Sequence, residues 1–146
     1  DVFEKMVEYA ARSLARHGFR DIVLIGDHGS YQKDLAAVAA RLNREWAKTP
    51  ARVYAITEYY DQSAHGFAKL LERGGYSAGE IGTHAGLADT SLMMALDPSL
   101  VRGDRLRPGE GDNGDPSRSS AALGAQGVEL IVTKSIDAIR RATARR

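Results

Sequence analysis

Two short segments that contain histidine hold the side chains of this sequence best suited to chemistry. The first is Asp27-His28-Gly29-Ser30, which directly follows an apolar run typical of a strand buried in a parallel sheet. In open α/β sheets, sites form at the carboxyl ends of strands, where the next helix presents free N–H groups. An imidazole beside a carboxylate at this position can bind a metal ion or act as a general base.

Two other interpretations of this first segment remain. Asp27 and Ser30 can simply cap the next helix, which leaves His28 without a role. A phosphate site at the start of that helix is less favoured, because only Gly26 and Gly29 are glycines and no Walker lysine follows.

The second segment is 82–91 (GTHAGLADTS). His84 lies in a loop flanked by glycines, and Asp89 falls in the first turn of the predicted helix that follows, so the two side chains can converge on one point. Such a pair suits a hydrolytic metal site. The alternative is that the polar residues after the loop only cap the helix. The remaining histidines, His17 at a helix end and His65 on a helical face, are expected to be structural or exposed and are assigned no function.

Periodicity along the chain predicts the elements that must position these residues. Apolar residues at helical spacing predict helices at 2–14, 32–46, 61–73, 87–96 and 119–144. Apolar runs rich in β-branched residues predict strands at 21–26 and 52–57. The segment 79–86 is predicted to be a polar connection, and 103–116 a long surface loop, with a lid over a pocket as the alternative. Tyr59 and Tyr60, after the second strand, could line a pocket, although packing is the favoured role.

This order of elements predicts a layered α/β fold with a parallel sheet and right-handed crossovers. Two parallel strands make a sheet too small to be stable alone, so we expect further strands before Asp1. The 146 residues, of which 43% are hydrophobic, are expected to form a single domain over 1–146.

Composition excludes several classes of function. The sequence has no cysteine, which excludes zinc fingers, thiolate nucleophiles and redox motifs. A net charge of +1 argues against a nucleic-acid partner, and no apolar run is long enough to span a membrane. The first residues lack the apolar core of a signal peptide, which predicts a cytoplasmic protein.

Taken together in this order, the two segments resemble the motifs of the creatininase family of amidohydrolases. A buried strand ends in Gly-Asp-His-Gly, and about 55 residues later His-Ala-Gly-x-x-acid-Thr-Ser runs into a Leu- and Met-rich helix and Asp-Pro. The resemblance covers roughly Arg20 to Arg102, with a weaker match at Gly114-Asp115-Pro116. It implies a three-layer α/β/α fold with a mainly parallel sheet, incomplete here at its N-terminus.

The resemblance also implies an activity and roles for individual residues. Members hydrolyse a non-peptide C–N bond, in a cyclic amide such as creatinine or in a formamide, with two divalent metal ions (Zn, Mn or Fe), and are commonly homo-oligomers. By position, His28 matches a metal ligand, His84 the histidine that transfers a proton to the leaving nitrogen, and Asp89 an acidic residue, usually Glu, at the metal centre. Ser30 and Tyr31 replace a Gly and an Asn of the motif and, with Asp27, are expected to contact substrate or support the ligands.

One feature of the family has no counterpart in these residues. A Glu-x-His-Gly stretch followed by a metal-bridging Asp, expected near the N-terminus, is absent from this sequence. The chain is therefore expected to correspond to the C-terminal three-fifths of such an enzyme. The alternatives are a metal-free binding or assembly module with the same fold, and a peptide-maturing member of a cofactor pathway.

Overall fold

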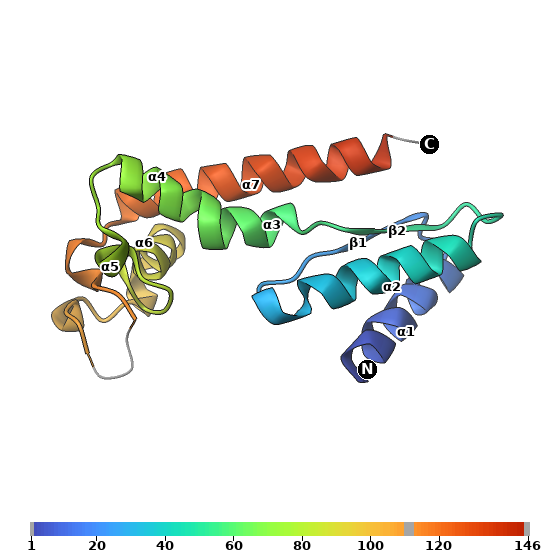
Figure 1. Ribbon diagram of the computed structural model, residues 1–146, viewed down its shortest axis with the longest axis horizontal. Coiled ribbons are helices and arrows are strands. Elements are labelled where there is room, and N and C mark those ends of the chain that lie inside the picture. The colour runs from blue at the N-terminus through green and yellow to red at the C-terminus, as the bar shows by residue number, and fades with distance from the viewer. Residues whose placement is uncertain (1, 110–112, 145–146) are drawn as a thin grey trace. The chain divides into compact units, whose positions relative to one another are not determined.

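The computed structural model describes residues 2–109 and 113–144. Within this part of the chain the strands are β1 (Asp21–Leu24) and β2 (Arg52–Ala55) (Figure 1). The helices are α1 (Val2–Arg16), α2 (Gln32–Glu45), α3 (Glu58–Asp61), α4 (Phe67–Arg73), α5 (Ala78–Ile81), α6 (Leu87–Leu96) and α7 (Ala121–Thr143). They form two compact units: unit 1 comprises the residues up to Tyr60 and those from Lys134, and unit 2 comprises Asp61–Thr133. The predicted α/β class is confirmed.

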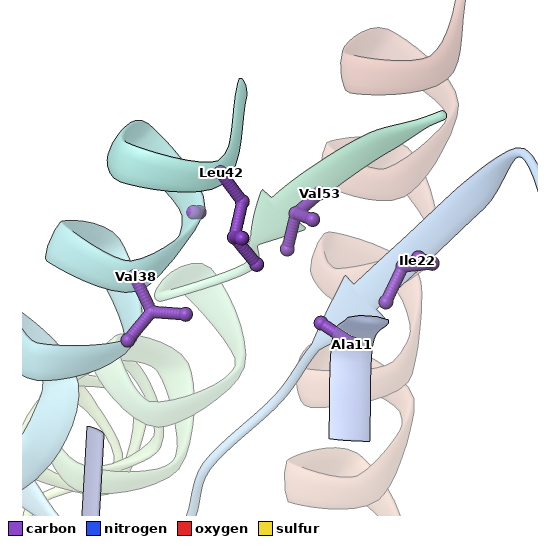
Figure 2. Close-up of a cluster of buried hydrophobic side chains, with 6 residues drawn as sticks. Ala11, Ile22, Val38, Leu42 and Val53 are labelled. Carbon is purple, nitrogen blue, oxygen red and sulfur yellow. The ribbon is translucent and has the colours of Figure 1, made fainter. Parts of the chain in front are cut away.

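Unit 1 contains the parallel sheet. β1 pairs with β2 in a register that runs from Asp21 opposite Arg52 to Leu24 opposite Ala55. Ile22 and Val53 therefore lie side by side on one face of the sheet and pack against α1 and α2 (Figure 2). The core cluster there consists of six buried residues, Ala11, Ile22, Val38, Ala39, Leu42 and Val53.

On the edge of β2 that faces away from β1, the backbone groups of Val53 bond to a side chain of α2. The amide nitrogen of Asn43 donates to the carbonyl of Val53 at 2.7 Å, and the N–H of Val53 donates to Asn43 Oδ1 at 2.9 Å. An unpaired strand edge exposes backbone groups that can pair with other chains. Asn43 occupies these groups at the position where a third strand would pair with Val53.

Ion pairs connect α1 and α2 at the solvent side of the core. Arg41 pairs with Glu4 and Glu8 at 2.9 Å each, and Arg12 pairs with Glu8 and Glu45. These side chains are 20–49% exposed, so water screens each pair and the pair stabilises the contact only modestly. The helix predicted at 2–14 is confirmed, but not all of its apolar residues are buried, since Val2 and Met6 are exposed by 71% and 67%.

Unit 2 is helical in its described part and has its own core. The buried side chains Phe67, Leu71, Ile81, Leu87 and Ala88 cluster where α4, α5 and α6 meet. Gly124 of α7 allows close packing on α6, because a Cβ there would lie 1.8 Å from the carbonyl oxygen of Ser91. None of the helices in the described part of the chain combines the length and apolar character that a membrane span needs.

Most predicted boundaries agree with the structure to within two residues, for example both strands, which end two residues earlier than predicted, and two predicted segments differ by more. The helix expected at 61–73 begins at Glu58 and contains a π-helical turn, Gln62–Gly66, between α3 and α4. The connection expected at 79–86 contains α5, which begins with a capping box between Ser77 and Glu80. A single turn of helix is too short to show periodicity in the sequence, which explains why apolar spacing did not reveal α5.

Candidate functional site

His28 lies just beyond the carboxyl end of β1, at the start of the 3-10 turn Gly29–Tyr31. Its Nδ1 accepts a hydrogen bond from the N–H of Ser30 at 3.1 Å and lies 2.9 Å from the Ser30 hydroxyl. The amide of Gln32 donates to the carbonyls of Gly26 and His28, at 2.9 and 3.0 Å, and so fixes the loop. Because Nδ1 accepts from a backbone N–H, neutral His28 carries its ring proton on Nε2.

Tyrosines surround the first segment. The hydroxyl of Tyr31 accepts a hydrogen bond from the N–H of Asp27 at 2.9 Å, and its ring lies 5.8 Å from that of His28. Tyr59 approaches from beyond β2: burial raises the pKa of its hydroxyl, and the charge of Asp27 and a hydrogen bond to it raise the pKa further. A side chain at Gly29 would collide with the Tyr60 hydroxyl at 2.8 Å. Asp27, His28 and Tyr31 are thus brought together in unit 1.

Two residues near His28 were not predicted from the sequence to belong to the site: Gln32, which was given no role, and Tyr59, for which packing was favoured. Tyr59 follows β2, and the parallel pairing of the two strands places the residues after both at the same edge of the sheet. This property of parallel strands could have predicted from the sequence that Tyr59 lies near the residues after β1. Gln32 carried no such signal, because its role is a pair of side-chain bonds to a loop whose path is set by tertiary structure.

In unit 2, His84 lies in an exposed loop whose backbone is held at both sides. The N–H of Asn113 donates to the carbonyl of His84 at 2.9 Å, and this pair forms an antiparallel bridge. Ala85 adopts a left-handed conformation, with φ of 53°. Its N–H donates to Asp89 Oδ2 at 3.2 Å, and its carbonyl accepts from the Thr90 hydroxyl at 3.3 Å. Asp89 and Thr90 of α6 thus hold the residue that follows His84 in the loop.

Three glycines allow the His84 loop and the segment after Asn113 to approach so closely. A Cβ on Gly82 would lie 1.8 Å from the carbonyl oxygen of Asn113, and a Cβ on Gly114 would lie 2.6 Å from the Cα of Gly86. Gly82 also has a φ of 65°, which favours glycine. The end of the predicted surface loop 103–116 is therefore part of this site.

Glu80 anchors the same segment from α5. Its backbone carbonyl accepts the N–H of Asp115 at 2.9 Å. Hydrogen bonds from the backbone N–H and hydroxyl of Ser77, and then from Arg118, lower the pKa of Glu80 to about 2. Arg118 lies 2.8 Å from the carboxylate and 4.3 Å from the ring centre of Tyr76. The carboxylate of Glu80 is thus committed to structure and remains charged at neutral pH.

The three residues matched to the metal centre are divided between the units, with His28 in unit 1 and His84 and Asp89 in unit 2. Within the described ranges, no group of three or more His, Cys, Asp or Glu side chains could hold a metal ion. His28 presents a proton rather than a lone pair at Nε2, and Asp89 uses one oxygen for Ala85. Protein metal sites generally need about three or four protein ligands. Among the described residues, neither unit taken alone therefore holds a complete metal site.

Comparison with known proteins identifies the family. The family model described as creatinine amidohydrolase (Creatininase) matches residues 1–139. A solved structure of a W154F mutant creatininase is similar, with a TM-score of 0.70 and 26% identity over 97% of this chain. A W154A mutant creatininase shares the fold, with a TM-score of 0.70 and 24% identity. The chain spans 63% of each of these two chains. A search of curated proteins finds no match. The chain belongs to the creatininase family.

Proposed function

We propose that the protein is an amidohydrolase of the creatinine amidohydrolase kind, which uses water to cleave the C–N bond of a small non-peptide amide. The family match supports the class of reaction. The observation that carries the proposal is the position of His84, an exposed residue on a loop held by backbone bonds to Asn113 and by the bond from the Ala85 N–H to Asp89. Exposure gives the ring access to substrate, and the backbone bonds hold its main chain in place.

Hydrolysis of an amide requires two proton movements. Water must lose a proton as its oxygen adds to the carbonyl carbon, and the nitrogen must gain one as the C–N bond breaks. A histidine can do both, because neutral imidazole accepts a proton at one nitrogen and imidazolium then donates it. His84 is assigned this task, with a cyclic amide such as creatinine, or a formamide, as substrate.

Metal dependence belongs to this proposal, with ligands beyond the described residues completing the site. Asp89 has one carboxylate oxygen outside its bond to Ala85, which makes it the candidate ligand in unit 2. His28 could ligate through Nε2 only with its ring proton on Nδ1, which would end the bond from the Ser30 N–H and let Nδ1–H donate to the Ser30 hydroxyl at 2.9 Å. Homo-oligomer formation and cytoplasmic location stay predictions.

The test is His84→Ala in the complete protein, assayed for hydrolysis of creatinine and of a formamide with Zn²⁺ or Mn²⁺ added. Turnover should fall by about 10²-fold or more, the usual scale for loss of a general acid or base, while metal content stays unchanged. The control is His65→Gln, which replaces an exposed histidine in the π-helical turn and should leave turnover intact. Unchanged turnover in His84→Ala would remove His84 from the reaction. A wild-type protein that neither hydrolyses these amides nor binds metal would instead be the metal-free module.

A further inference from the structure

A groove of about 960 Å³ lies in unit 1 at the edge of the sheet where the strands begin. It is formed by the end of α1, the turn before β1 and the connection between α2 and β2, and Arg20 and Ala51, which line it, directly precede the two strands. His28 lies beyond the opposite end of β1. A four-residue strand spans about 13 Å, so a small ligand in this amino-edge groove would not reach the residues around His28.

Aromatic side chains form much of the amino-edge groove. Tyr9 and Phe19 line it with 70% and 55% of their surfaces exposed. Trp46 also lines it, with the guanidinium of Arg12 5.9 Å from its ring centre. Aromatic faces gathered in a concave surface favour contact with another ring, by stacking or edge-to-face packing.

Three arginines line the groove, Arg12, Arg16 and Arg20, and they differ in whether a carboxylate of the protein pairs with them. Arg12 pairs with Glu8 and Glu45. Arg16 and Arg20 line the groove and are exposed, and no ion pair among the described residues involves either of them. Two unbalanced guanidinium groups beside aromatic rings favour a ligand with negative charge.

Arg52 binds backbone carbonyls beside the groove that would otherwise repel an anion. The last carbonyls of a helix carry partial negative charge. Here the guanidinium of Arg52 donates to the carbonyls of Trp46, Thr49 and Ala51 at 3.0, 2.7 and 2.6 Å. It thereby offsets the partial negative charge of these three carbonyls, which lie at the cap of α2 and in the connection after it, and it fixes this connection. At the end of α1, His17 Nδ1 bonds to the carbonyl of Ser13 at 2.7 Å.

We propose that the amino-edge groove binds a small anion that carries an aromatic ring. The ring contacts Tyr9, Phe19 and Trp46, and the anionic group pairs with Arg16 and Arg20. The volume of about 960 Å³ lies within the range of about 300–1,000 Å³ that small-molecule sites occupy. Within unit 1 the site is separate from the residues around His28, and the proposal does not depend on the chemistry of the candidate amidohydrolase residues.

Trp46 is the single tryptophan of the 146 residues, so its fluorescence reports on the groove directly. The probe is AMP, compared with adenosine, which keeps the rings without the charge, and with inorganic phosphate, which keeps the charge without the rings. AMP should change the fluorescence in a saturable manner, with a Kd at least about tenfold lower than that of either partial probe. Added salt should raise the Kd, and Trp46→Phe should abolish the signal.

Variants locate the binding. Arg16→Gln and Arg20→Gln should each raise the Kd for AMP by roughly fivefold to tenfold. The matched control is Arg102→Gln, which removes one exposed positive charge in unit 2 and should leave the Kd unchanged. Thermal unfolding of each variant shows that it is folded, and isothermal calorimetry provides a second measurement of the Kd.

Several outcomes would overturn the proposal. AMP and adenosine could bind equally well, the Arg16→Gln and Arg102→Gln proteins could bind AMP alike, or AMP could give no signal at concentrations up to about 10 mM. Self-association of the chain that AMP does not reverse, detected by sedimentation, would show that a second copy covers the groove. Each of these results would exclude a small aromatic anion as the occupant.

Discussion

His84 and Asn113 are joined by two backbone hydrogen bonds, 2.9 Å from the Asn113 N–H to the His84 carbonyl and 3.3 Å in the reverse direction. The N–H of Thr83 adds a third bond, to the same Asn113 carbonyl, at 2.7 Å. The loop therefore cannot move away from Asn113 without breaking these hydrogen bonds. The position of the His84 main chain therefore depends on Asn113, which is distant from it in the sequence.

The close approach at Gly82 predicts that Gly82→Ala destabilises the protein. The left-handed backbone alone should cost roughly 1–3 kcal/mol, and the new Cβ would also meet the carbonyl oxygen of Asn113. The free energy of unfolding, measured with denaturant, should fall accordingly. Hydrogen exchange at the amides of Thr83 and His84 should become faster, because their bonds to Asn113 must break.

Gly79→Ala is the matched control for that substitution. Gly79 lies within α5, has ordinary backbone geometry, and has open space where a Cβ would be placed. Alanine there should stabilise the protein by roughly 0.5–1 kcal/mol. Equal effects of the two substitutions would contradict the packing described for Gly82.

Asp89 can be tested for two separate tasks. Asn at this position retains an oxygen that can accept the Ala85 N–H, but it loses the charge. Asp89→Asn should therefore lower metal affinity by at least about tenfold and cost less than about 1 kcal/mol of stability. Asp89→Ala also loses the hydrogen bond and should cost about 1–2 kcal/mol. Metal content is measured by elemental mass spectrometry, and stability by thermal unfolding of the metal-free protein. A normal metal content in Asp89→Asn would leave Asp89 with only its structural role.

Glu80 predicts a component of acid sensitivity with a defined sign. The pKa of Glu80 is lowered from 4.5 to about 2 in the folded protein. At a pH between about 2 and 4.5, Glu80 is therefore protonated to a greater extent in the unfolded chain than in the folded one. The resulting stabilisation is present above about pH 5 and is lost as the pH falls toward about 2. Glu80→Gln can keep the capping box but not the charge. The stability difference between wild type and this variant should shrink across that interval in denaturant titrations.

Arg118→Gln separates the contributions to that effect. It removes the ion pair with Glu80 but leaves the two hydrogen bonds from Ser77. The acid dependence should become weaker without disappearing, since Ser77 is the larger cause of the lowered pKa. Loss of the whole effect in Arg118→Gln would show that the ion pair dominates instead.

The main helices and strands and the fold class could be predicted from the amino-acid sequence. Apolar spacing located α1, α2 and α6, and β-branched runs located both strands, because burial of one helical face or of a whole strand leaves a pattern within a few neighbouring residues. The placement of His28 after β1 also followed, since that needs only the end of the strand. The family followed from two motifs read in order, and the match over 1–139 confirms it.

The contacts between segments distant in the chain could not be predicted from the sequence. The bridge of His84 to Asn113, the bonds of Asn43 to Val53 and the glycine contacts at Gly82 join residues that no periodicity relates. These are hydrogen bonds and close approaches between side chain and backbone, or between two loops. Their formation depends on the positions of whole elements, whereas apolar patterning reports only which face of each element is buried.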